Sequence, residues 1–230
     1  MTAVQKVTVA VFDVDETLIR CKSMFSFLEY ALVAKLGAAE GRRAYSLVLE
    51  DLRQARTNLP REAVNRQFYR SLAGWKLSEL AELAFDWFRD HRNKDLYFPE
   101  PLARLRWHQQ QGHRTVLLSG SATFIIAPIA LDLSVDDTLA ITLRKHSDGT
   151  TDGEIEGIQT IGQGKADALI RYLARFDHSP GLFGYGDHES DLPFLTICDQ
   201  RFLVLPSQSS LPDWAQGCGR IDVSGEGVLA

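Results

Sequence analysis

The sequence contains few cysteines, and their placement excludes several kinds of stabilising site. Only three occur among 230 residues, at Cys21, Cys198 and Cys218. Their odd number and wide spacing indicate neither a disulfide framework nor a zinc site. We therefore expect a protein that folds around an apolar core, as its hydrophobic content of 45% allows.

The chain also lacks long runs of one charge and long apolar segments. A net charge of −5 without any extended Lys/Arg run argues against nucleic acid or an anionic membrane as a partner. Residues 1–6 contain no apolar stretch of the signal-peptide type, and serine, glycine and proline interrupt the most apolar later segment, "TVLLSGSATFIIAPIAL". We expect a soluble, cytoplasmic protein without a membrane span.

A long segment near the N-terminus has a helical pattern and no strand signal. Between about residues 23 and 91, four stretches carry apolar residues at three- and four-residue spacing. Gly41, Pro60 and Gly74 are expected to separate these helices, and Ser78 is expected to cap the fourth. We predict that residues 20–99 form a helical cap subdomain, while 1–19 and 100–230 form the core domain.

Short β-branched runs alternate with helical segments on both sides of this block. "VTVAVFDVD" has the continuous apolar character of a strand buried on both faces. "HRTVLLSG", "DTLAITLRKH", "GLFGYGD" and a last strand, "RFLVLP", follow, and the Asp-Gly pairs of "SDGTTDGE" predict a hairpin turn. The alternation predicts an α/β fold with a doubly wound, mostly parallel, Rossmann-like sheet. The final "SGEGVLA" is expected to be a loose tail.

Polar side chains able to do chemistry lie where several of these strands end, or where the next helix begins. Ligands of open α/β sheets bind beyond the carboxyl ends of the strands. Seven residues share such a placement: Asp13, Asp15, Thr17, Ser119, Lys165, Asp187 and Asp191. Each of them alone is an ordinary turn or helix-start residue. Their joint occurrence in this order indicates one shared site.

These motifs resemble those of the haloacid dehalogenase superfamily, in the branch similar to phosphoserine phosphatase. That family's pattern is Asp-x-Asp-x-Thr after the first strand, Ser or Thr after the second, then a lysine, then Gly-Asp-x-x-x-Asp. The chain contains "DVDET", "SGS", "GK" and "GDHESD" in this order. The resemblance spans roughly residues 7–206, and it implies the haloacid dehalogenase fold with a helical cap inserted after the first motif.

The chemistry of phosphate monoesters gives each of these residues a role. A carboxylate nucleophile divides hydrolysis into two displacements through an aspartyl-phosphate, and we assign Asp13 to this step. Asp15 is placed to act first as general acid and then as general base. Thr17 and Ser119 can donate hydrogen bonds to phosphoryl oxygens, and Lys165 supplies positive charge. Because a departing halide needs no proton, Asp15 favours phosphate chemistry over dehalogenation.

Crowded carboxylates also require a cation. Mg²⁺ prefers oxygen ligands and would neutralise both the acids and the phosphate. The resemblance implies metal contacts from the Asp13 side chain, the Asp15 backbone carbonyl and the Asp187 side chain, with Asp191 supporting this arrangement from nearby. We therefore expect a Mg²⁺-dependent phosphatase.

The expected partner is a small phosphorylated metabolite, and a homodimer is a possible assembly. Two alternatives stay open. The chain could be a phosphotransferase that passes the phosphoryl group to an alcohol, or a phospho-accepting signalling domain with a long-lived acyl-phosphate. Phosphoserine is one candidate substrate, although its phosphatases carry a glutamate shortly after the first motif. Here the matching "LIRCKSMF" contains no acid.

Several cap residues are candidates for contact with the substrate. Met24 and Phe25 follow the first motif closely and are expected either to line the pocket or to pack in the core. Five cations of the cap region could meet an anionic substrate: Arg20, Lys22, Arg43, Arg56 and Arg66. His188, inside the fourth motif, is interpreted as a residue of the helix-entry turn without a ligand role.

Overall fold

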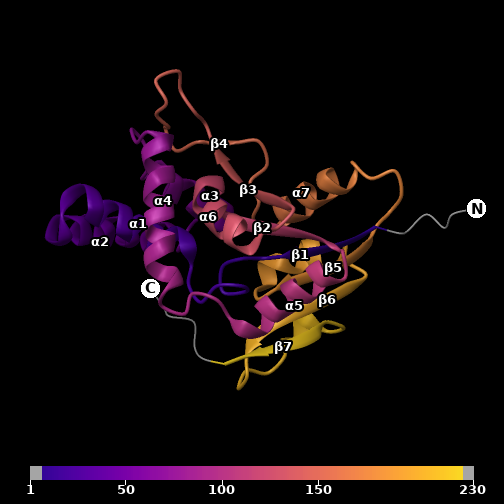
Figure 1. The fold of residues 1–230 in the computed structure, drawn as a ribbon. Helices are drawn as coiled ribbons and strands as arrows, with labels where there is room; N and C mark the ends of the chain where they lie inside the picture. Colours follow the sequence, from indigo (N-terminus) through magenta and orange to yellow (C-terminus); the bar gives the residue numbers. More distant parts are fainter. Residues whose placement is uncertain (1–6, 225–230) are drawn as a thin grey trace, which may run out of the picture.

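A seven-stranded sheet forms the centre of the computed structural model, which describes residues 7–224 (Figure 1). Its order is β4-β3-β2-β1-β5-β6-β7, and neighbouring strands run parallel except for β3 and β4. The strands are β1 (Thr8–Phe12), β2 (Arg114–Ala122), β3 (Asp137–Leu143), β4 (Ile155–Glu156), β5 (Gly181–Gly186), β6 (Gln200–Pro206) and β7 (Gly219–Val223). The predicted mostly parallel α/β fold is confirmed.

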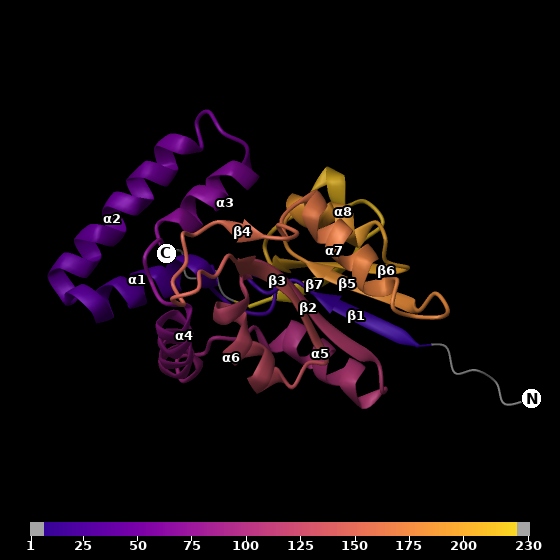
Figure 2. The same cartoon turned by 90° about the horizontal axis from the view of Figure 1, so that it is seen from above.

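Helices cover both faces of the sheet (Figure 2). On one side lie α5 (Pro99–Gln110) and α6 (Thr123–Leu133), and on the other lie α7 (Gln163–Leu173) and α8 (Leu192–Leu195). Strand β1 shows why: Val9 and Val11 pack in the cluster that contains α7 and α8, whereas Phe12 packs in the cluster of the opposite face. Successive side chains of a strand point to opposite faces, so a doubly covered strand is apolar throughout.

Four helices lie between β1 and α5. They are α1 (Ser23–Leu36), α2 (Ala38–Ala55), α3 (Arg61–Arg70) and α4 (Leu77–Arg92). The segments that enter and leave this block are hydrogen-bonded to each other, because Arg20 N donates to Leu96 O and Phe98 N donates to Leu18 O, both at 2.9 Å. No helix within residues 7–224 has the length and apolar character needed to cross a bilayer.

Two expected helix boundaries in this block are wrong. The break between the first two helices lies at Gly37, which has φ 83°, and Gly41 lies inside α2. A Cβ at residue 41 would come within 2.5 Å of the Val33 Cα, so this glycine allows α1 and α2 to pack closely. Ser78 does not cap α4, because the helix already begins at Leu77 after the extended residue Lys76.

The prediction that "RFLVLP" is the last strand is also wrong. Strand β7 follows it and pairs in parallel with β6. Ile221 and Val223 of β7 are buried, while Arg220 and Asp222 are exposed. This short, half-polar edge strand has none of the continuous apolar character of the inner strands, which explains the missed prediction. The expected tail begins at Ser224, and its residues 225–230 lie outside the described part of the chain.

Candidate active site

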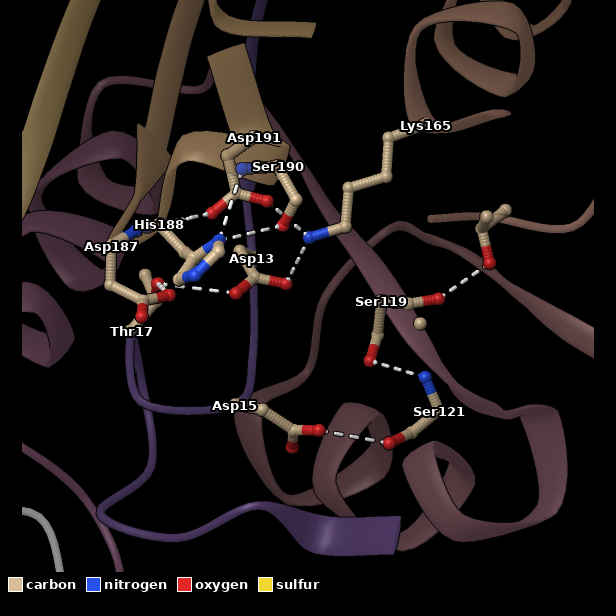
Figure 3. A network of polar contacts seen from close by, with 12 residues as sticks. Asp13, Asp15, Thr17, Ser119, Ser121, Lys165, Asp187, His188, Ser190 and Asp191 are labelled. Carbon is tan, nitrogen blue, oxygen red and sulfur yellow. Dashed lines mark hydrogen bonds and ion pairs between the residues drawn. The ribbon is translucent and has the colours of Figure 1, made fainter. Parts of the chain in front are cut away.

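Asp13 lies at the carboxyl edge of the sheet, directly after β1. Its backbone N–H donates to Tyr185 O at 2.9 Å, which continues the pairing with β5 by one residue. The buried Lys165, in the first turn of α7, donates through Nζ to Asp13 Oδ1 at 2.6 Å and to Asp191 Oδ1 at 2.6 Å. One ammonium group therefore pairs with two carboxylates that come from different strand ends (Figure 3).

Asp187 and Thr17 complete this group. The Thr17 hydroxyl is buried and lies 2.9 Å from Asp187 Oδ1 and 3.3 Å from Asp13 Oδ2. Asp191 Oδ2 accepts the backbone N–H groups of Asp187 and His188, both at 3.2 Å. Thr17 thus contacts carboxylates here, and its expected contact with a phosphoryl oxygen stays a prediction.

Two glycines allow the chain to approach this closely. A Cβ on Gly186, at the end of β5, would lie 2.7 Å from Asp191 Oδ2. A Cβ on Gly164, one residue before Lys165, would lie 1.8 Å from the Gln159 carbonyl oxygen. Such contacts are too short for any other residue without movement of the chain. The glycines therefore fix how the turns present Lys165 and Asp191 to Asp13.

The three aspartates form a group of carboxylates that could hold a cation. Carboxylate oxygens of Asp13, Asp187 and Asp191 all lie within 4.8 Å of one another. Burial raises the pKa of Asp13 to about 6 although Lys165 opposes the shift, and burial raises the pKa of Asp187 well above its usual range. Burial also disfavours the Lys165 ammonium, but Asp13 and Asp191 outweigh this and raise its pKa. A further positive charge would stabilise this arrangement.

The Asp15 side chain points away from the three clustered carboxylates. Its Oδ1 accepts the Ser23 backbone N–H at 3.0 Å, and its Oδ2 accepts the Ser121 hydroxyl at 2.9 Å (Figure 3). The Ser23 hydroxyl in turn donates to Ser121 Oγ at 2.8 Å. Burial raises the pKa of Asp15 despite these bonds, so its protonated form is favoured relative to an exposed aspartate. The expected metal contact of its backbone carbonyl stays a prediction.

Ser119 lies inside β2, whereas the sequence placed it after the strand. The register between β2 and β3 shifts between Leu118 and Ala122, so residues 119–121 form an irregular segment of the strand. Ser119 is fully buried, its Oγ accepts the Ser121 N–H at 3.0 Å, and its carbonyl accepts the Thr160 hydroxyl at 2.6 Å. It belongs to the chain of contacts around Asp15, and its role toward phosphate stays a prediction.

A cavity of about 410 Å³ opens between the aspartate cluster and the helices α1 to α3. Its floor includes Asp13, Asp15, Lys165, Asp187 and Asp191. The other lining residues are mainly apolar side chains and cations of the helical block: Lys22, Met24, Phe25, Leu52, Arg56, Leu59, Arg61, Val64, Asn65 and Phe68. The cavity thus joins the predicted catalytic residues to a separate, partly basic wall.

The structure places only some of the cap candidates at the cavity. Met24 and Phe25 line the cavity, as do two of the five predicted cations, Lys22 and Arg56. Arg20 instead donates to Ser224 O at 2.8 Å and packs over the Phe98 ring. The exposed Arg43 lies near Glu40, and Arg66 donates to Gln159 Oε1 at 2.8 Å.

Sequence reasoning missed Arg61, Ser23 and Ser121. Arg61 lies at the start of α3, with its guanidinium nitrogen 2.9 Å from His188 Nδ1. That ring nitrogen also accepts the Ser190 N–H at 3.0 Å and so caps the short helical turn at 189–191. The "SGS" motif contained a signal for Ser121, since a second hydroxyl two residues from the first lies on the same side of a strand.

Comparison with known proteins shows to which family the chain belongs. The family model of haloacid dehalogenase-like hydrolases matches residues 10–196. The chain belongs to that family. A histidinol-phosphatase of Neisseria meningitidis is 26% identical over 204 residues, which are 86% of this chain and 90% of the relative. A probable phosphatase of Mycobacterium tuberculosis is 26% identical over 219 residues, which are 90% of this chain and 72% of the relative.

Solved structures agree with the fold. A Bordetella pertussis protein of unknown function superposes with a TM-score of 0.81 at 26% identity, and covers 95% of this chain and 99% of its own. A phosphoserine phosphatase in a phospho-aspartyl intermediate analogue form has a TM-score of 0.59 at 15% identity, with 87% of each chain covered. The second likeness is one of fold alone.

Proposed function

We propose that this haloacid dehalogenase-like hydrolase is a Mg²⁺-dependent phosphatase, which cleaves a small-molecule phosphate monoester through an aspartyl-phosphate on Asp13. The observation that carries the proposal is the arrangement around Asp13. A buried carboxylate lies against Lys165 and beside Asp187, at the floor of a cavity that can enclose a small ester. Phosphoryl transfer depends mainly on such positioning and electrostatic stabilisation.

The donor set fits Mg²⁺, a hard cation that binds carboxylate oxygens. Asp13 and Asp187 are the side chains we expect to hold it. Asp191 is better suited to orient them, because its Oδ1 already accepts from Lys165 and its Oδ2 from two backbone N–H groups. The bound ion would offset the negative charge that Asp13 and the phosphate bring together.

Each side chain has a defined role in the two displacements. Asp13 attacks phosphorus, and the ester oxygen leaves with a proton from Asp15. A water then attacks the aspartyl-phosphate while Asp15 removes a proton from it, which releases phosphate and restores Asp13. The raised pKa of Asp15 suits the acid step, and Lys165 remains charged throughout because Asp13 and Asp191 stabilise its ammonium form.

Product release is the direct test of the proposal. The purified chain should release inorganic phosphate from p-nitrophenyl phosphate with Mg²⁺ present and not after chelation. Histidinol phosphate, the ester that the name of the Neisseria relative suggests, is assayed beside it. Transfer of phosphate to an added alcohol in place of water would instead support a phosphotransferase. A stable acyl-phosphate without turnover would support a signalling domain, and no metal-dependent release from any ester would refute the proposed activity.

A further inference from the structure

Asn65 is a buried amide in the wall of the cavity, on helix α3. It is 6% exposed, and its Oδ1 accepts a hydrogen bond of 2.9 Å from Gln159 Nε2. Its Nδ2 has only long contacts, 3.5 Å to Gly120 O and 4.0 Å to Met24 Sδ. A buried donor is normally paired at shorter distances than these. The Asn65 amino group is therefore poorly satisfied where it meets the cavity.

The neighbours of Asn65 fix the orientation of its amide. Arg66 Nε can only donate, so the Gln159 atom that lies 2.8 Å from it is the oxygen, Oε1. The other end of Gln159 is then the amino group, and it donates to the Glu62 carbonyl at 2.8 Å as well as to Asn65. Asn65 must accept with Oδ1, which leaves Nδ2 at Gly120 and Met24, two residues that line the cavity.

The charges of the cavity wall favour the same kind of ligand. Arg56 and Arg61 line the cavity, and neither forms an ion pair with a carboxylate among the described residues. Apart from the four aspartates, Glu16 is the one acid among the described lining residues, and Lys22 Nζ lies 3.3 Å from it. Among the described residues of this wall, no free carboxylate is available to hold a substrate ammonium group.

We propose, on the basis of the phosphatase function above, that Asn65 is a specificity-determining residue whose Nδ2 donates to an acceptor oxygen of the substrate. Gln159 is the positioning residue that holds the amide in this orientation, with Arg66 fixing Gln159 in turn. The preferred substrate class is a phosphate monoester whose other end carries a carboxylate, and an ammonium group at that end is disfavoured.

The test uses matched probes of equal length. The phosphate monoesters of ω-hydroxy acids and of ω-amino alcohols, with chains of two to four carbons, differ at the far end, which is a negatively charged acceptor in one series and a positively charged donor in the other. For the wild-type chain with Mg²⁺, kcat/KM should favour the carboxylate probe by about 10-fold or more at the preferred length, since hydrogen bonds to charged groups are the stronger ones.

Two variants test whether the preference for the carboxylate probe comes from the Asn65 amide or from the overall charge of the cavity. Asn65→Leu keeps the size and removes the donor, so the carboxylate-to-amine ratio should fall about 10-fold. Gln159→Glu replaces the donor that faces Asn65 with an acceptor. The Asn65 amide should then turn to donate to the new carboxylate, so that Oδ1 faces the cavity and the ratio falls further toward the amine probe.

Gln67→Glu is the matched control. Like Gln159→Glu it adds one negative charge, but on α3 and at a side chain outside the cavity lining. Its ratio should stay within about twofold of wild type, a change far below that of a lost charged hydrogen bond. Equal ratios in wild type and both variants, equal falls in Gln67→Glu and Gln159→Glu, or no use of any carboxylate probe would each overturn the role of Asn65. Failure of wild type to hydrolyse p-nitrophenyl phosphate would instead refute the phosphatase function itself.

Discussion

Two buried polar networks lie at and just beyond strand β5, and they treat charge in opposite ways. Beyond its carboxyl end, Asp13, Asp187 and Asp191 gather around one ammonium group, that of Lys165. On the strand itself, the Tyr185 hydroxyl lies 2.8 Å from Nε2 of the buried His108. The first network keeps formal charges inside the protein, and the second is neutral when its histidines are neutral.

The pKa values show that burial disfavours charge in both networks and that only one of them stays neutral. Burial raises the pKa of Asp13 to about 6, and burial together with nearby His113 and Arg104 lowers the pKa of His108 to about 4. Both environments therefore penalise charge. The His108 network avoids the cost of burying charge, since a neutral ring can accept at one nitrogen and donate at the other, where His113 Nδ1 lies 2.8 Å away. The aspartate cluster instead keeps charged groups in a buried place, which is the pattern of a functional site.

Replacement of Asp13 by asparagine should have the largest effect on activity. The amide cannot form the phosphoenzyme, so kcat should fall by about 10⁴-fold or more. Thermal unfolding without metal should show no loss of stability, because the variant removes one of three crowded carboxylates while Lys165 keeps its ion pair with Asp191. Steady-state assays and calorimetry check both halves. Turnover within about tenfold of wild type would show that another group is the nucleophile.

Asp15→Asn should lower activity by a smaller factor that depends on the leaving group. Loss of a general acid costs roughly 10² to 10⁴ in rate for an alkyl phosphate, whose alkoxide must be protonated as it leaves. With p-nitrophenyl phosphate the loss in the first step should be less, because nitrophenolate leaves without a proton. Burst kinetics with both esters measure this difference. Equal losses for the two leaving groups would argue against an acid role for Asp15.

Lys165→Met should lower the free energy of unfolding more than a substitution in the His108 network does. It leaves Asp13 and Asp191 buried without their cation, and breaking a buried pair costs about 3–5 kcal/mol. Tyr185→Phe removes one neutral hydrogen bond and should cost about 1–3 kcal/mol. Urea unfolding without metal compares the two variants. A smaller loss for Lys165→Met than for Tyr185→Phe would contradict the contrast between the networks.

The sequence was informative about the aspartate cluster and silent about the histidine network, for a topological reason. Residues that follow parallel strands converge at one edge of a sheet, so Asp13 and Asp187 could be placed together once the strands were recognised. His108 and Tyr185 meet across 77 residues, from a helix and the next-to-last residue of strand β5, and no local pattern records that contact. Arg61 and Asn65 were missed for the same reason, since the way α3 packs on the core decides which of its polar side chains reach the cavity.

The two networks should also change stability with pH in opposite directions, which is the smallest of these effects. An unfolded histidine titrates near 6.5 and His108 near 4, so between these values the unfolded chain binds more protons than the folded one. His108 therefore makes the free energy of unfolding fall as pH falls, by about 2 kcal/mol between pH 7 and pH 5. Raised aspartate pKa values act in the opposite sense, because there the folded chain binds the extra proton.

A comparison of variants isolates the histidine contribution. The loss of stability between pH 7 and pH 5, measured by urea unfolding without metal, should be about 2 kcal/mol smaller in His108→Phe than in wild type. The aspartates are common to both proteins and cancel in this difference. The exposed His178 provides the control, and His178→Gln should lose as much stability as wild type. If His108→Phe also loses as much as wild type, His108 is not the neutral, buried member of the network that its contacts indicate.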